Sequence, residues 1–179
     1  RKIRQIVAGR DCRLSGLEYE KQFVDGVLSC GIDVIDLGHV MTQMVYYGQY
    51  LFQTNGGVMI TASHNPKNFN GFKLAIGFSQ TTGPDEVQEL RKYVESENFF
   101  SSDIKGTLTQ ANIKENYFKD ILKRVQIKRK FKVIVDSHHG TTSIYNPDLI
   151  RKAGCEVIER FTSVDGSFPA GTPDPTDAK

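Results

Sequence analysis

Residues 56–76 constrain the fold of this 179-residue chain more than any other stretch, because two apolar runs flank a polar loop. The run 58–60, Val-Met-Ile, follows a pair of glycines and predicts a short buried strand. Asn65-Pro66 and Asn70-Gly71 then predict turns, because proline fixes its own φ and Asn-Gly tolerates positive φ. The apolar run 72–76 predicts a second strand. We expect this unit to hold its polar loop at the edge of a sheet, where α/β proteins place their chemistry.

The rest of the chain alternates apolar strands with amphipathic helices. Further strands are predicted over residues 5–8, 32–37, 131–136 and 155–159, and helices over 15–30, 41–52, 112–125 and 143–153. One more helix opens at Gly83-Pro84, with Leu90 and Val94 expected on its inner face. This alternation predicts an α/β protein whose first domain, residues 1–110, is a three-layer α/β/α structure with a mixed sheet.

A linking helix and a second α/β unit are predicted over residues 111–179. Its two predicted strands do not make a stable sheet by themselves, so we expect an incomplete second domain and a chain that is a fragment. Residues 98–110 are polar without clear periodicity and are expected to form an irregular approach to the domain boundary. The tail from Val164 is rich in proline and glycine and shows no core-forming pattern.

Composition argues against several classes of protein. The chain carries 23 Lys and Arg against 21 Asp and Glu, and this net charge of +2 is too small to favour a nucleic-acid partner. No apolar run approaches the length of a membrane span. Cys12, Cys30 and Cys155 have no CxxC spacing and fit a reducing compartment. We therefore expect a cytoplasmic protein with no nucleic-acid partner and no membrane contact.

Four motifs in order resemble those of the α-D-phosphohexomutase superfamily. Residues 61–66, Thr-Ala-Ser-His-Asn-Pro, and residues 70–73, Asn-Gly-Phe-Lys, resemble its phosphoserine loop. The other similar stretches are residues 9–16, 36–42, and 165–169 with 173–176. The group that the chain resembles most is the bacterial phosphomannomutase/phosphoglucomutase group. The resemblance covers nearly the whole chain and implies the first domain and part of the second domain of such an enzyme.

The resemblance implies an intramolecular phosphotransferase that interconverts hexose 1-phosphate and hexose 6-phosphate, with mannose or glucose as the sugar. Ser63 would carry the phosphoryl group and exchange it with the substrate through a hexose 1,6-bisphosphate, which also serves as activator. Physically, a serine hydroxyl is a poor nucleophile without a base or a positive field. A tight loop with backbone N–H groups and a nearby lysine suits the positioning that phosphoryl transfer needs.

Lys73 and His64 complete the predicted catalytic set. By resemblance, Lys73 is the general acid/base, and its place between Phe72 and Leu74 gives it a partly apolar setting that favours the neutral amine. An exposed strand lysine is the alternative. His64 is expected either to hydrogen-bond a phosphoryl oxygen or to orient the loop.

Arg10, Arg13 and Asn65 are the candidate phosphate-binding residues. Arginine suits phosphate recognition, so Arg10 and Arg13 could supply positive charge beside Ser63. A pairing of either arginine with Asp11 that only supports the loop is an equal alternative. Asn65 is expected to shape the turn more than to touch substrate.

A metal is implied only through the resemblance. The family binds Mg²⁺ with an Asp-Gly-Asp-x-Asp-Arg loop of its third domain and with the phosphoserine, here Ser63 through its phosphoryl oxygen. No such acidic loop occurs in the sequence. His138 and His139 lack a cysteine or carboxylate at suitable spacing to complete a metal site, and they replace a turn that in the family is more often Gly-Asn-Gly. We therefore expect that the 179-residue chain does not turn over substrate alone.

Three other functions compete with this one. A phosphoglucosamine mutase would more often carry isoleucine at the position of Phe72. A serine hydrolase using Ser63 and His64 would need a glycine-flanked nucleophile elbow, which the sequence lacks, and adjacent side chains rarely face each other. A non-catalytic sugar-phosphate-binding module would keep the loop for binding only. Hexose phosphates are the expected partners, and the family leans to monomers.

Overall fold

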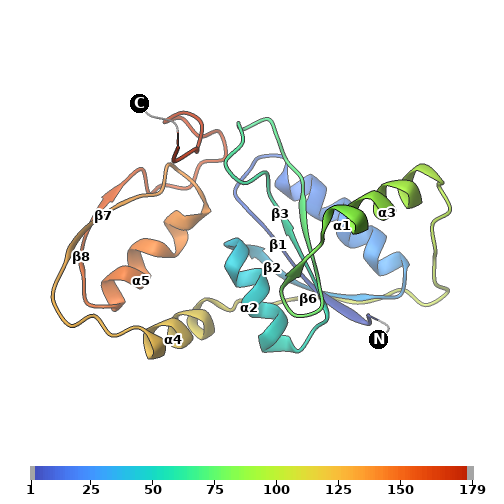
Figure 1. Ribbon diagram of the computed structural model, residues 1–179, viewed down its shortest axis with the longest axis horizontal. Helices are drawn as coiled ribbons and strands as arrows, with labels where there is room; N and C mark the ends of the chain where they lie inside the picture. Colours follow the sequence, from blue (N-terminus) through green and yellow to red (C-terminus); the bar gives the residue numbers. More distant parts are fainter. Residues whose placement is uncertain (1–2, 177–179) are drawn as a thin grey trace.

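The computed structural model describes residues 3–176 and contains a six-stranded and a two-stranded sheet (Figure 1). The larger sheet has the order β5-β4-β3-β1-β2-β6. Its strands are β1 (Gln5–Arg10), β2 (Asp33–His39), β3 (Gly56–Ile60), β4 (Phe72–Ile76), β5 (Gln80–Thr81) and β6 (Leu108–Gln110). β3, β1, β2 and β6 run parallel, whereas β4 and β5 are antiparallel to their neighbours. The predicted mixed sheet is confirmed.

Helices cover both faces of this sheet. α1 (Gly16–Ser29) packs on one face, where Val24 contacts a buried set that includes Ile6 and Val58. α2 (Thr42–Phe52) packs on the other face, where Met44 lies in a larger set with Val7. Because β1 is buried between the two helices, its side chains alternate between two separate cores. The three-layer prediction is confirmed (Figure 1).

The far edges of the first domain differ from the prediction at α3 (Pro84–Glu95), at β6 and at the short strand β5, which was not expected. α3 forms as expected, but Leu90 and Val94 are 45% and 52% exposed, so they do not lie on an inner face. β6, where irregular chain was expected, pairs with β2 through the register Val34↔Leu108. A strand at a sheet edge is defined by main-chain hydrogen bonds, so exposed side chains can hide it from an analysis of periodicity.

A second α/β unit follows α4 (Lys114–Arg124). β7 (Lys132–Asp136) and β8 (Glu156–Arg160) form a parallel pair, as predicted. The helix expected between them is divided into a 3₁₀ turn, Thr141–Ile144, and α5 (Asn146–Lys152). Proline fits only the first turn of a helix, and Pro147 lies at the start of α5, which explains the division.

The two units share one core on the α2 face of the larger sheet. Phe118 of α4 and Tyr145 lie in the same buried set as Val7 and Met44. The Tyr145 hydroxyl also donates a hydrogen bond to the His39 carbonyl. The linking helix is therefore part of the first domain's packing. Among residues 3–176, no helix is both long and apolar enough to cross a bilayer.

We predict that Phe118→Ala lowers the free energy of unfolding by about 3–5 kcal/mol, because Phe118 is 1% exposed and its removal leaves a cavity between α4 and the sheet. Urea denaturation of the 179-residue chain measures this loss. Phe100→Ala is the matched control, since Phe100 is 61% exposed and its truncation should change the stability by less than about 0.5 kcal/mol. Equal losses from the two variants would contradict the shared core.

Candidate active site

Ser63 lies at the exposed start of the loop that follows β3. β1 and β3 are parallel with Arg10 beside Ile60, and the Asp11 N–H continues the ladder by donating to the Ile60 carbonyl (3.0 Å). Ser63 has φ 58°, which is uncommon for a residue with a side chain. Such a conformation persists only where surrounding contacts fix it, and it is typical of functional sites. The contacts of the neighbouring residues must therefore fix this loop.

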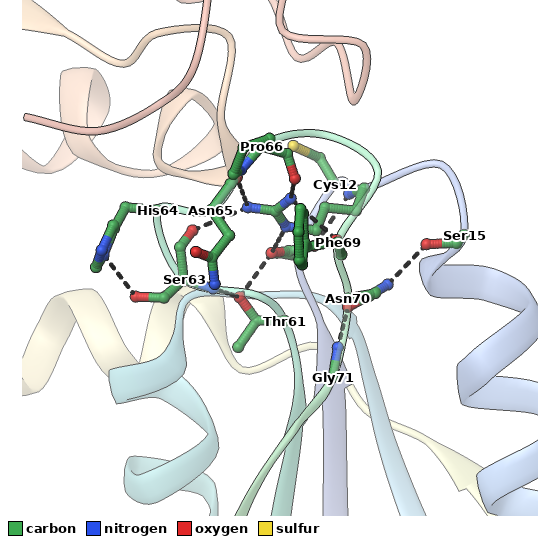
Figure 2. A network of polar contacts seen from close by, with 12 residues as sticks. Cys12, Ser15, Thr61, Ser63, His64, Asn65, Pro66, Phe69, Asn70 and Gly71 are labelled. Atoms are coloured by element: carbon green, nitrogen blue, oxygen red, sulfur yellow. Dashed lines mark hydrogen bonds and ion pairs between the residues drawn. The ribbon is translucent and has the colours of Figure 1, made fainter. Parts of the chain in front are cut away.

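Asp11 and Thr61 fix the backbone at Ser63 (Figure 2). The Thr61 hydroxyl donates to Asp11 Oδ2 (2.7 Å) and accepts from the Ser63 N–H (2.9 Å). Asp11 Oδ1 accepts the Arg13 N–H at 3.0 Å. From the sequence, Asp11 was expected only as a possible partner of an arginine, and no role was expected for Thr61. Their signal was present, because each follows one of two adjacent parallel strands, whose carboxyl ends meet at one edge.

Arg13 holds the whole loop with its guanidinium. It is 2% exposed and salt-bridged to Asp11. Its five N–H donors go to Asp11 Oδ2 (3.2 Å) and to the carbonyls of Pro66 (2.7 Å), Phe69 (3.1 Å), Ser63 (3.1 Å) and Asn65 (2.8 Å). An arginine has only five such donors, so none remains for a substrate phosphate. This contradicts the phosphate-binding role for Arg13 and supports the alternative in which it pairs with Asp11 and supports the loop.

Arg10 takes a different partner from the one expected. Its Nε donates to Glu20 Oε2 at 2.7 Å, on the α1 side of the sheet, and it does not line the cleft described below. Burial raises the pKa of Glu20, the nearby Asp36 carboxylate adds to this rise, and Arg10 opposes it. The arrangement is a buried polar cluster behind the loop, and it gives no contact for Arg10 with a ligand at Ser63.

Ser63, His64 and Lys73 line one cleft of about 1000 Å³ between the two units. Lys73 pairs with Met59 in the β3–β4 ladder, which places it on the α2 side of the sheet. Ser63 Oγ and His64 Nδ1 are 3.3 Å apart, so the two adjacent side chains do face each other, contrary to the general expectation (Figure 2). The structure thus brings the three predicted catalytic residues to the same cleft.

Asn65 takes part in the loop through its backbone. Its N–H donates to the Ala62 carbonyl (3.1 Å), and its own carbonyl accepts from Arg13. Asn65 does not line the cleft. The expected turn-shaping role fits these contacts, whereas contact with substrate has no support in the arrangement.

The opposite wall of the cleft comes from the turn after β7. His138 and His139 both have positive φ, 46° and 60°, which explains why glycine and asparagine suit such a turn. His138 Nε2 lies 3.0 Å from the Gly171 carbonyl, and His139 Nδ1 lies 2.9 Å from the Ser163 carbonyl. The Ser137 hydroxyl is buried on this wall and has no hydrogen-bond partner in the part of the chain that the structure describes.

The residues of the cleft do not form a complete metal site. Within residues 3–176, no group of three or more His, Cys, Asp or Glu side chains is placed to hold a metal ion. Mg²⁺ prefers six oxygen ligands in an octahedron, and a Ser63 phosphoryl group would supply only part of such a set. The described residues therefore do not fit a resident Mg²⁺ by themselves.

We predict that Thr61→Val lowers the free energy of unfolding by about 1–3 kcal/mol, because it removes a buried hydroxyl between two polar groups and keeps the shape of the side chain. Denaturant unfolding of this chain is the measurement. Thr109→Val is the control, at an exposed position of β6. A loss no larger than that of the control would contradict the role of Thr61 as the link between Asp11 and Ser63.

We predict that Glu20 makes the free energy of unfolding depend on pH. The folded-state pKa of Glu20 is raised by burial, so its contribution to stability is full below the unfolded-state pKa, about 4.3, and is lost as the pH rises through the folded-state value. Relative to Glu20→Gln, the wild-type chain should therefore lose stability as the pH rises from 4 to neutral. Urea denaturation across this range is the measurement, with Glu18→Gln, at an exposed site of the same helix, as the control for lost charge. A difference that grows in favour of the wild type would show that the Arg10 pairing outweighs burial.

Comparison with known proteins assigns both units to one family. A family model described as phosphoglucomutase/phosphomannomutase, alpha/beta/alpha domain I, matches residues 1–101, and the model for domain II matches residues 115–179. The predicted boundary between residues 110 and 111 falls in the stretch between the two matches and remains a prediction.

Individual relatives agree with this assignment. The chain is 42% identical over 170 residues to the phosphomannomutase/phosphoglucomutase of Pseudomonas syringae pv. tomato, covering 95% of this chain and 36% of that protein. It is 37% identical over 175 residues to a phosphoglucomutase of Neisseria meningitidis serogroup A, covering 98% of this chain and 38% of that protein. The chain thus spans less than two-fifths of the length of these curated relatives.

A solved structure shows the same arrangement. The crystal structure of a phosphoglucomutase/phosphomannomutase family protein from Burkholderia thailandensis matches with a TM-score of 0.89 and 31% identity, over 97% of this chain and 39% of that one. The Ser63 loop and every strand described except β6 lie within the ranges matched by the two family models. The chain belongs to the phosphoglucomutase/phosphomannomutase family.

Proposed function

We propose that this chain forms the phosphoserine-bearing part of a phosphohexomutase that interconverts hexose 1-phosphates and 6-phosphates of glucose or mannose. The observation that supports this proposal most is the loop in which Ser63 is exposed, held with positive φ, and brought to one cleft with Lys73. Relatives that match the chain are named phosphomannomutase/phosphoglucomutase, phosphoglucomutase and, in Methanothermobacter thermautotrophicus, probable phosphoglucosamine mutase. These names support a phosphohexomutase reaction and do not select the sugar.

In the proposed reaction, Ser63 gives and receives the phosphoryl group, and Lys73 accepts and returns the proton. The bond between Ser63 Oγ and phosphorus breaks as a sugar hydroxyl oxygen bonds to that phosphorus, and the hydroxyl proton passes to the Lys73 amine nitrogen. The resulting hexose 1,6-bisphosphate then reverses its orientation in the cleft, so that its other phosphoryl group faces Ser63. Its other phosphoryl group then bonds to Ser63 Oγ, and the protonated Lys73 returns the proton to the sugar oxygen. Proton transfer of this kind contributes about 10²–10⁴-fold to a rate.

His64 is proposed to assist this transfer without acting as a base. Its Nδ1 lies 3.3 Å from Ser63 Oγ, so a protonated ring nitrogen could donate to a phosphoryl oxygen there. A serine hydrolase would need an orienting partner for the imidazole, and within residues 3–176 no hydrogen bond joins His64 to a carboxylate. The hydrolase alternative therefore lacks the carboxylate that would orient His64.

The Mg²⁺ implied by the resemblance is proposed to bind a phosphoryl oxygen on Ser63, where it would stabilise charge on the transferred group. Its remaining ligands would come from the length of the relatives that this chain does not span. A hexose 1,6-bisphosphate is the proposed activator. The proposal also includes that the protein is monomeric, lies in the cytoplasm and binds hexose phosphates.

The sugar preference does not follow directly from Phe72. Its ring stacks on Tyr19 of α1, with centroids 5.9 Å apart, and lies 5.8 Å from the ring of Phe23. Phe72 does not line the cleft. The phenylalanine that argues against a phosphoglucosamine mutase therefore packs β4 on α1. We propose that residues other than Phe72 recognise the sugar.

We predict that Ser63→Ala abolishes mutase activity and that Lys73→Met lowers it about 10²–10⁴-fold. The assay uses this chain continued with the remaining length of the Pseudomonas syringae relative, Mg²⁺, a trace of glucose 1,6-bisphosphate, and glucose 1-phosphate or mannose 1-phosphate in parallel. Ser101→Ala, at an exposed serine outside the cleft, is the control and should retain full activity.

Two outcomes would overturn the proposal. Full activity in Ser63→Ala would exclude the phosphoserine mechanism. Binding of glucose 1-phosphate without turnover, with Ser63 unphosphorylated by mass mapping, would instead establish the non-catalytic sugar-phosphate-binding module. Glucosamine 1-phosphate as the only sugar converted would replace the proposed substrate while keeping the mechanism.

A further inference from the structure

We propose that Phe168, in the tail after β8, is a positioning residue for the Ser63 loop and acts through Arg13. This inference rests on the proposed function for its catalytic consequence. The sequence pattern of the tail gave it no part in a core, yet Phe168 is 7% exposed. Its ring lies 5.3 Å from the guanidinium carbon of Arg13. The tail of the second unit thus contacts the side chain that binds four carbonyls of the Ser63 loop.

The contact lies on a flat face of the Arg13 guanidinium, which its hydrogen bonds leave unused. The edge of its guanidinium is fully used, because all five N–H groups donate to Asp11 and to loop carbonyls. The flat faces of a guanidinium form no hydrogen bonds and are weakly hydrated, so an aromatic ring is a suitable cover. With the ring in place, water is kept away from a set of hydrogen bonds that it would otherwise compete for.

The backbone of the tail is fixed so that the ring stays there. Phe168 has φ 48°, a conformation that an aromatic residue adopts only when its surroundings impose it. The Asp165 carbonyl accepts the Phe168 N–H at 3.0 Å, and Asp165 Oδ1 accepts the Ser167 N–H at 2.8 Å. Hydrogen bonds from Ser167 hold the pKa of the Asp165 carboxyl below its ordinary value. The Asp165 N–H in turn donates to the His139 carbonyl at 2.9 Å.

A close backbone approach joins this turn to the residue before Arg13. A Cβ atom on Gly166 would lie 2.1 Å from the Cys12 carbonyl oxygen, so only glycine fits. The Cys12 thiol lies 3.7 Å from the His139 carbonyl. Burial raises the pKa of this thiol, which keeps it in the neutral, donating form. The 165–168 turn is therefore packed directly against Cys12 and Arg13. A displacement of the tail would remove this support from the Ser63 loop.

The first test is amide hydrogen exchange in the 179-residue chain without any substrate. Phe168→Leu removes the aromatic face but keeps an apolar side chain. We expect exchange of the Ser63, Asn65 and Phe69 amides to rise about 5- to 30-fold, the range of a desolvated cation–π contact. Phe168→Tyr keeps the ring and should stay within about twofold of the wild type.

The matched control is Phe131→Leu, which removes the ring from another cation–π pair, with Arg129, whose carbon lies 4.5 Å from the ring centroid. This variant should leave the three loop amides unchanged. Equal rises in Phe168→Leu and Phe131→Leu would overturn the proposal. A uniform rise that includes the β1 amides, or a Phe168→Leu chain that does not fold, would also overturn it, because Phe168 would then support the whole fold and not the loop.

A second readout separates this inference from the proposed function. In the chain extended with the remaining length of the Pseudomonas syringae relative, Phe168→Leu should lower kcat about 5- to 30-fold with little change in KM, and Phe168→Tyr should restore it. Loop exchange that depends on Phe168 in an extended chain without mutase activity would support the positioning role and reject the proposed function. Mutase activity that requires Ser63 but not the Phe168 ring, with unchanged loop exchange, would reject the positioning role alone.

Discussion

The candidate site depends on the buried guanidinium of Arg13. A charge taken out of water is stable only where every donor is satisfied, and here one carboxylate and four carbonyls satisfy all five. Removing one partner of such a pair typically costs about 3–5 kcal/mol, because the other charge stays buried. A lysine could not replace this residue, since a single ammonium has three donors and cannot span carbonyls that belong to four positions of one loop.

The register of the larger sheet explains why Arg13 can reach those carbonyls. Arg10 lies beside Ile60 in parallel strands, so the chain leaves β1 next to the point where it leaves β3. Asp11 and Thr61 then meet within hydrogen-bond distance, and Arg13 lies over the loop that starts at Ser63. The general rule that α/β sheets carry their sites beyond the carboxyl ends of the strands therefore has a specific cause here, which is a pair of adjacent strand ends joined by one carboxylate.

The second unit makes the cleft and completes the support of the loop. Phe118 and Tyr145 anchor it in the core on the α2 face, and the turn after β7 forms the wall opposite Ser63. Positive φ recurs at Ser63, His138, Phe161 and Phe168, all of which line this cleft. Residues in this conformation are held by their neighbours, so the backbone around the proposed chemistry is fixed by its contacts.

By itself, the sequence determined six of the eight strands described in residues 3–176, the mixed three-layer domain, the loop between β3 and β4, and the family, because apolar periodicity and turn residues act over short stretches of chain. It also determined which residue types stand at the loop, and Ser63 and Lys73 are proposed as catalytic residues from these and from the family resemblance. Only the tertiary structure decided what Arg13 contacts, since its partners include carbonyls more than 50 positions away. β6 and the buried Phe168 were hidden for the same reason, because one is defined by main-chain pairing with β2 and the other by contact with Arg13, and neither leaves a local pattern.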